Sequence, residues 1–189
     1  MVNRVSVIVT AALLLVITAC GRTEAGEPRT TTEQRLSPPV PMPKDGRGVE
    51  QCHALTTEQV STLGGDPASV KFEEAEFGVA GPACAWSALD NRWTMSIGIN
   101  TDAAVGGLET TYLNEQRDVF AIFEPFEIDG HPAVRAQQEV SPECGIAIGL
   151  ADTQLVSIDM TRRDESVDTC EIARRAGSAL LSNLPPLER

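Results

Sequence analysis

The sequence predicts an α+β domain, in which an antiparallel sheet of about five to six strands packs with two to three helices and is held by two disulfides. Three observations lead to this class: segments that alternate apolar and polar residues, helix-capping patterns before and after them, and four cysteines spread through the same region. The expected order of helix, strand pair, helix, four strands and helix fits an antiparallel sheet covered by helices.

The first expected element is a short helix. Thr56 and Gln59 have the spacing of a capping box, in which each residue satisfies a backbone amide of the other. Val60 and Leu63 provide its apolar side, and Gly64-Gly65 ends it.

A hairpin is expected next. Residues 84–86 suggest the end of a strand, and a turn follows at residues 90–91. Residues 93–100 then alternate with period two, as a half-buried strand does. We interpret Trp86 and Trp93 as core and hairpin partners rather than as a stack for a ligand.

The second half of the domain begins with a helix predicted over residues 107–118, with Leu108, Tyr112 and Val119 on its inner face. Four strands follow, around tight turns at residues 129–132 and 151–153. Asp168 and the three residues after it then predict the start of a last helix. Its apolar stripe is Ile172, Ala176, Leu180 and Leu184, and Pro185-Pro186 ends it.

The four cysteines of this region are Cys52, Cys84, Cys144 and Cys170. An even number in an exported chain predicts two disulfides, for which three pairings are open. We favour Cys52–Cys84 and Cys144–Cys170, because each bond would tie a helix start to a nearby strand. A zinc site is the rival interpretation, but CxxC does not occur in the sequence, so we expect no metal and no other cofactor.

The first 20 residues have the pattern of an export signal. Arg4 precedes an apolar run from Val5 to about Ile17, which is shorter than the roughly 20 apolar residues of a transmembrane helix. The ending Ile17-Thr18-Ala19-Cys20 resembles the bacterial lipobox. We expect a signal peptide over residues 1–19, palmitate-type lipid on Cys20 and a place on the extracytoplasmic face of the cell membrane. The alternative is an unpaired cysteine in a signal that is cut nearby.

Residues 20–50 are expected to be a lipidated start followed by a disordered tether, with a single domain over residues 51–189. Prolines, threonines and charged residues dominate this stretch, and large apolar residues are almost missing. Such a composition buries too little surface to offset the entropy of ordering the chain.

The charge of the domain excludes one class of partner. Residues 51–189 carry nine basic and 22 acidic side chains, a net charge of −13. Such a surface repels phosphate, so nucleic acid is not an expected partner. The membrane is expected to be reached through the lipid alone, and the acidic surface to keep the exported domain soluble.

Several motifs together resemble a known family. They are the lipobox, the Pro/Thr-rich stretch, Cys84-x-Trp86, Phe126-x-x-x-Gly130-x-Pro132-Ala133-Val134, Cys144-x-Ile146-x-Ile148, and Cys170 before an Ala-rich helix that ends Leu184-Pro185. This arrangement is similar to the actinobacterial lipoproteins grouped as domain of unknown function 3558. The resemblance implies an envelope location and brings no catalytic residue with it.

Two functions remain. We prefer a non-enzymatic binding or accessory domain that recognises a small ligand, a wall component or another envelope protein. It predicts an apolar cleft or a sheet-face pocket without convergent titratable groups. The alternative is an unfamiliar extracytoplasmic hydrolase, which requires His131 or His53 beside a carboxylate in a cleft. For both histidines we favour roles in a surface turn and at a helix start.

Overall fold

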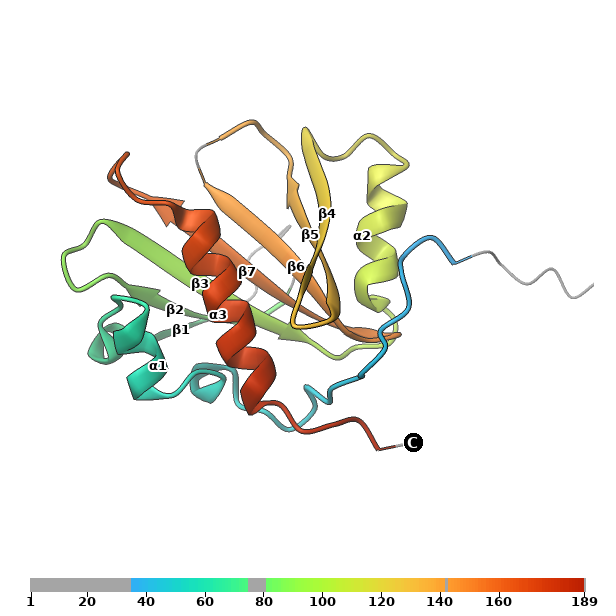
Figure 1. Cartoon of the computed structure of the whole chain (residues 1–189), viewed down its shortest axis with the longest axis horizontal. Coiled ribbons are helices and arrows are strands. Elements are labelled where there is room, and N and C mark those ends of the chain that lie inside the picture. Colours follow the sequence, from blue (N-terminus) through green and yellow to red (C-terminus); the bar gives the residue numbers. More distant parts are fainter. Residues whose placement is uncertain (1–34, 75–80, 142, 189) are drawn as a thin grey trace, which may run out of the picture. The chain divides into compact units, whose positions relative to one another are not determined.

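The computed structural model describes residues 35–74, 81–141 and 143–188, and within them the chain forms one antiparallel sheet of seven strands and three α-helices (Figure 1). This confirms the α+β class, with a strand count slightly above the predicted range. The strands are β1 (Lys71–Glu73), β2 (Ala83–Ser87), β3 (Trp93–Asn100), β4 (Ile122–Ile128), β5 (His131–Gln137), β6 (Cys144–Ala151) and β7 (Gln154–Arg162). The helices are α1 (Thr57–Thr62), α2 (Gly107–Glu115) and α3 (Thr169–Asn183), with 3-10 turns at Gln51–His53 and Pro67–Ser69.

The sheet has the order β1-β2-β3-β7-β6-β5-β4. Its centre is β7, which pairs with β3 from Trp93↔Arg162 to Asn100↔Leu155 and with β6 on its other side. The β4–β5 hairpin closes through Asp129 and Gly130, both with positive φ, as a two-residue hairpin turn requires. The short exposed strand β1 was not predicted, because its three residues show no alternation of burial.

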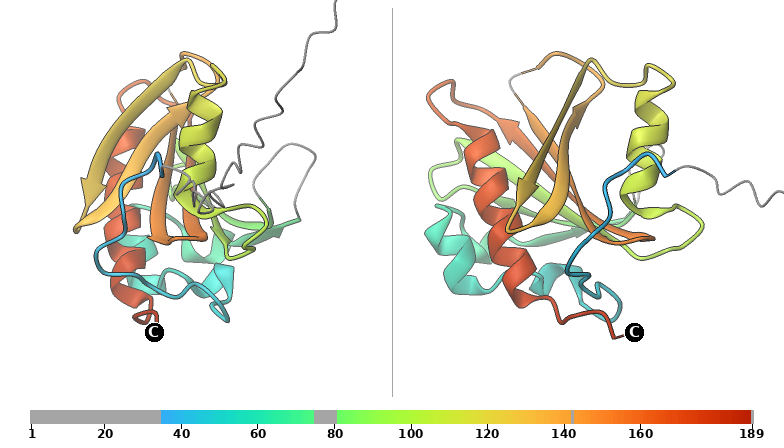
Figure 2. Two further views of the ribbon diagram at one scale, coloured as in Figure 1. Left: turned by 90° about the vertical axis from the view of Figure 1, so that its right-hand side faces the viewer. Right: turned by 45° about the vertical axis from the view of Figure 1, so that its right-hand side comes forward.

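Helices lie on both faces of the sheet (Figure 2). On one face, α3 packs so closely that a Cβ added at Gly177 would stand 2.6 Å from the Cδ1 of Ile148. On the other face, Leu108 of α2 lies close to Gly149. Gly149 and its neighbour Ile148 face opposite sides of the sheet, because successive residues of a strand alternate between its faces. The main core therefore lies between α3 and the sheet, and it includes Trp86 and Trp93 as predicted.

The predicted helix starts are confirmed. Thr56 and Gln59 form both hydrogen bonds of a capping box, at 2.8 and 3.2 Å. Asp168 caps α3 by accepting the amide of Glu171 at 3.0 Å. The second helix ends at Glu115 instead of residue 118, and Val119 is exposed rather than on its inner face.

The favoured disulfides are also confirmed. Cys52 is bonded to Cys84 and Cys144 to Cys170, with Cα atoms 5.1 and 5.2 Å apart. The first bond ties the 3-10 turn before α1 to β2, and the second ties β6 to the first turn of α3. Cys84 and Cys144 are fully buried, so both bonds are part of the core.

Residues 35–50 correct the expected domain boundary, because they are packed on the domain rather than free of it. The carboxylate of Glu109 accepts the amides of Leu36 and Ser37 at 2.9 and 2.8 Å. Further along, the Lys44 amide donates to the Leu150 carbonyl at 2.8 Å, and the Gly46 amide to the Gln154 side chain at 2.8 Å. The folded unit thus includes residues that were assigned to a tether.

The predicted signal peptide and the lipid site at Cys20 lie outside the described residues. Among the helices that the structure describes, none combines the length and the apolar character needed to span a bilayer.

Candidate functional site

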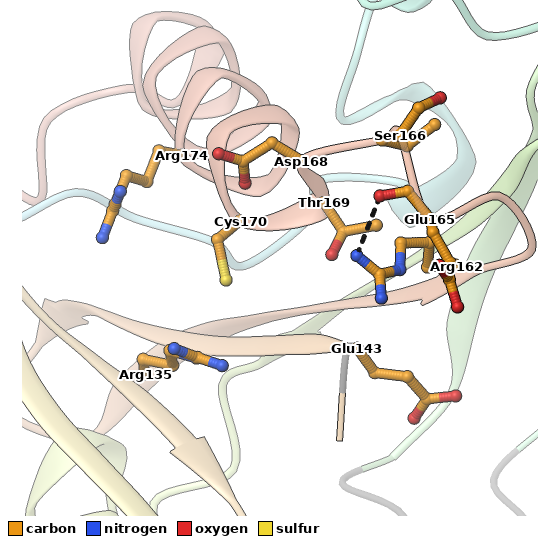
Figure 3. Close-up of a pocket in the computed structure, with 10 residues that line it drawn as sticks. Arg135, Glu143, Arg162, Glu165, Ser166, Asp168, Thr169, Cys170 and Arg174 are labelled. Carbon is orange, nitrogen blue, oxygen red and sulfur yellow. Dashed lines mark hydrogen bonds between the residues drawn. The ribbon is translucent and has the colours of Figure 1, made fainter. Parts of the chain in front are cut away.

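A pocket of about 490 Å³ opens where the first turn of α3 lies over the ends of β5, β6 and β7 (Figure 3). Three guanidinium groups line it, and they come from three elements: Arg135 from β5, Arg162 from β7 and Arg174 from α3. The Cys144–Cys170 disulfide joins the helix to the sheet here, and the sulfur of Cys170 points into the space between them. The position of the pocket is therefore set by a covalent bond.

The guanidinium of Arg135 is held in place by two neighbours. Its Nε donates to the Gln137 side chain at 2.8 Å, and its Nη1 lies 3.3 Å from the carboxylate of Glu124. Gln137 is in turn fixed, because its amide nitrogen donates to the Glu143 carbonyl at 2.8 Å. Arg135 is thus oriented before any ligand arrives.

The guanidiniums of Arg174 and Arg162 contact other kinds of partner than that of Arg135 does. The guanidinium of Arg174 lies 5.1 Å from the centre of the Phe126 ring, a cation–π contact. Arg162 donates to the backbone carbonyl of Glu165 at 3.3 Å. Within the described part of the chain, neither forms an ion pair with a carboxylate.

Three acidic residues, Glu143, Glu165 and Asp168, also line the pocket. Asp168 caps α3. The negative charge of Glu143 interacts with Asp159. Asp159 projects from the face of the sheet opposite to that of its buried neighbours. Loss of hydration, with a smaller effect of the Glu143 charge, raises the pKa of Asp159 to about 6. Figure 3 shows Arg135 and Arg174 at one side of the pocket and Glu143 and Glu165 at the other.

This geometry corrects the expected site. We predicted an apolar cleft or a sheet-face pocket without convergent titratable groups, whereas the pocket at the start of α3 is polar and gathers arginines. The sequence did not point to these arginines, because they are far apart in the chain. A usable signal existed: Arg174 follows Cys170 by one helical turn, and Arg135 pairs with Ile146, close to Cys144.

The two histidines do not share a cleft with an acid. His131, expected in a surface turn, is 2% exposed, and its Nδ1 lies 3.0 Å from the carbonyl oxygen of Gly149. His53 contacts the carboxylate of Glu50 at 3.0 Å, but both side chains are about three-quarters exposed (76% and 74%). Neither position provides the enclosed His–carboxylate pair that the hydrolase alternative requires.

A second pocket, of about 450 Å³, lies at the opposite end of β7. Its walls are the N-terminal segment at Val40, Pro43 and Arg47, the β6–β7 turn, and Leu187 near the end of the chain. Over the described ranges, no group of three or more His, Cys, Asp or Glu side chains is placed to hold a metal ion.

Comparison with known proteins gives a family. The family described as "Protein of unknown function (DUF3558)" matches the chain over residues 15–183. The chain belongs to this family. No curated protein and no solved structure matches it. The resemblance to this DUF3558 family is thereby confirmed, whereas its lipoprotein and actinobacterial aspects stay predictions. For this DUF3558 protein, function has to be argued from the site itself.

Proposed function

We propose that this DUF3558 protein is an envelope lipoprotein, anchored to the membrane through lipid on Cys20, whose folded domain is a non-enzymatic binding module. The module would take its ligand in the pocket at the start of α3. The ligand would be a small molecule, a wall component or a group on another envelope protein.

The pairing of the cysteines carries this proposal. The chain has five cysteines, and the two disulfides use the four that lie in the domain. Cys20 is therefore not needed for either bond, and it stands directly after an apolar run that ends in a lipobox pattern. Disulfides form and persist in exported proteins, so their presence agrees with a signal that directs the chain out of the cytoplasm.

The binding role is supported by the way the pocket is built. A preoriented Arg135 and an Arg174 that rests on an aromatic ring cost little entropy to order when a ligand binds. The placements of His131 and His53 favour binding over the hydrolase alternative.

Metabolic labelling with a palmitate analogue tests the anchor. We expect label on the wild-type protein and none on Cys20→Ala, while Ser6→Ala, a change inside the apolar run, keeps it. Unlabelled wild-type protein, or equal label on Cys20→Ala, would show that Cys20 is not the lipid site.

Thermal unfolding of the purified lipidated protein against a collection of metabolites and wall fragments tests the binding role. We expect at least one compound to raise the unfolding temperature and to be recovered chemically unchanged. Conversion of the bound compound into a product would contradict a non-enzymatic role, and so would a collection without any stabilising compound.

A further inference from the structure

We infer that the pocket at the start of α3 binds an oxyanion, the carboxylate or phosphate group of a small molecule, between the guanidiniums of Arg135 and Arg174. This inference deepens the proposed function and rests on it. It names the chemical class of the ligand, which neither the fold nor the family assigns.

Two like charges, those of Arg135 and Arg174, are held on the same face, and among the described residues they share no counter-ion. Phe126, on which Arg174 rests, pairs with Ala133 in the β4–β5 hairpin, two residues from Arg135. Residues related in this way are diagonal neighbours on one face of a sheet, about 7–8 Å apart. Figure 3 shows Arg174 extending from the helix toward the sheet, at the same side of the pocket as Arg135.

Basic residues are scarce in this domain. Residues 51–189 carry nine basic side chains against 22 acidic ones, and three of the nine line this pocket, together with the acidic residues Glu143, Glu165 and Asp168. Guanidinium groups that converge in this way favour planar oxyanions, because their paired N–H groups match two oxygens of a carboxylate or phosphate.

The acids near the arginines leave the charge of Arg174 without a salt-bridge partner among the described residues. Glu124 contacts Arg135 from the rim, where its side chain is 61% exposed, so water already solvates much of its charge. No ion pair of Arg174 with any carboxylate is found among the described residues. A bound oxyanion would supply Arg174 with its missing counter-charge. The pocket volume of about 490 Å³ is in the range of small-molecule sites.

The test is a calorimetric titration of the lipidated protein with inorganic phosphate, succinate and choline, at an ionic strength kept constant with sodium chloride. We expect saturable binding of phosphate or succinate and none of choline, and the tighter of the two anions shows which oxyanion the site prefers. Arg174→Gln should weaken that binding about 10-fold or more, since a hydrogen bond to a charged group is lost.

Arg175→Gln is the matched control, because Arg175 is the next residue of α3 and donates instead to the Thr62 carbonyl at 3.1 Å. It removes the same charge from the same helix and should leave the affinity unchanged. Arg135→Gln should weaken binding as Arg174→Gln does. Since Arg174 is exposed at the surface, its variant keeps the test valid if Arg135→Gln misfolds.

Three outcomes would overturn the inference: no saturable binding of either anion, equal weakening by Arg174→Gln and Arg175→Gln, or tighter binding of choline. The proposed binding role can be judged separately from the oxyanion assignment. If other compounds still stabilise the protein and Arg174→Gln does not affect them, the module binds ligands but the oxyanion assignment is wrong.

Discussion

Asp159 is the residue whose ionisation the fold disturbs most clearly. It stands on β7 between Ile158 and Met160, both buried, so its carboxylate projects from the opposite face of the sheet. Its pKa is raised from 3.8 to about 6, mainly because it loses hydration and further because Glu143 is near. A carboxyl with a raised pKa binds more protons in the folded chain, so the free energy of unfolding decreases as pH rises from about 4 to about 6.

Asp159→Asn should therefore stabilise the domain at pH 7, where the carboxylate is ionised in the folded protein. It should change the free energy of unfolding little at pH 4, where the carboxyl is protonated in the folded protein. The surrounding chain displaces only part of the water around Asp159, and the water that remains screens its charge, so we expect an increase of only about 1 kcal/mol in the free energy of unfolding. Urea unfolding at the two pH values measures it. Asp164→Asn is the control of opposite sign, since hydrogen bonds from Ser166 lower the pKa of Asp164. Equal effects of Asp159→Asn at both pH values would contradict the assignment.

At the scale of elements, periodic and capped segments could be predicted from the sequence, and the N-terminal segment could not. The alternation of β3 and the capping pairs of α1 and α3 are local, so they are visible in neighbouring residues. Residues 35–50 have the composition of a tether, yet their backbone amides find acceptors on Glu109, Leu150 and Gln154. Hydrogen bonds from the backbone to distant residues leave no trace in composition.

Glu109 is the first anchor of that segment. We expect Glu109→Ala to accelerate hydrogen exchange of the Leu36 and Ser37 amides about 10-fold, because the carboxylate that accepts both is removed. Exchange followed by mass spectrometry on short peptides resolves this. Glu58→Ala, an exposed change in α1, should leave both amides protected. Unchanged exchange in Glu109→Ala would mean that other contacts hold the segment.

At the scale of the whole molecule, the candidate site depends on long-range pairing. The disulfide pairing itself was predicted, and with the hairpin register it would bring Arg135 and Arg174 toward one place. What the sequence could not show was the cation–π contact of Arg174 with Phe126 or the hydrogen bonds that orient Arg135, because these depend on how α3 lies across the sheet. The fold class was therefore predictable, and the chemistry of the pocket was not.

The two disulfides should contribute comparably to stability, since they close loops of similar length, with sequence separations of 32 and 26. In the chain-entropy model, each contributes about 3.5 kcal/mol. We expect urea unfolding of Cys52→Ala/Cys84→Ala and of Cys144→Ala/Cys170→Ala to show losses of this size. The second pair should in addition weaken anion binding, because it frees α3 from β6 beside the pocket. A loss below about 1 kcal/mol for either pair would contradict the model.

Strand β7 runs between two sites of the domain, the contact at Asp152 and the pocket at Arg162. The strand begins beside Asp152, which contacts Arg35, and it ends at Arg162 in the pocket. Its nine residues hold these places about 25 Å apart. The segment at Arg35 therefore lies away from the mouth of the pocket. A long, polymeric ligand could extend outward from the pocket without meeting that segment.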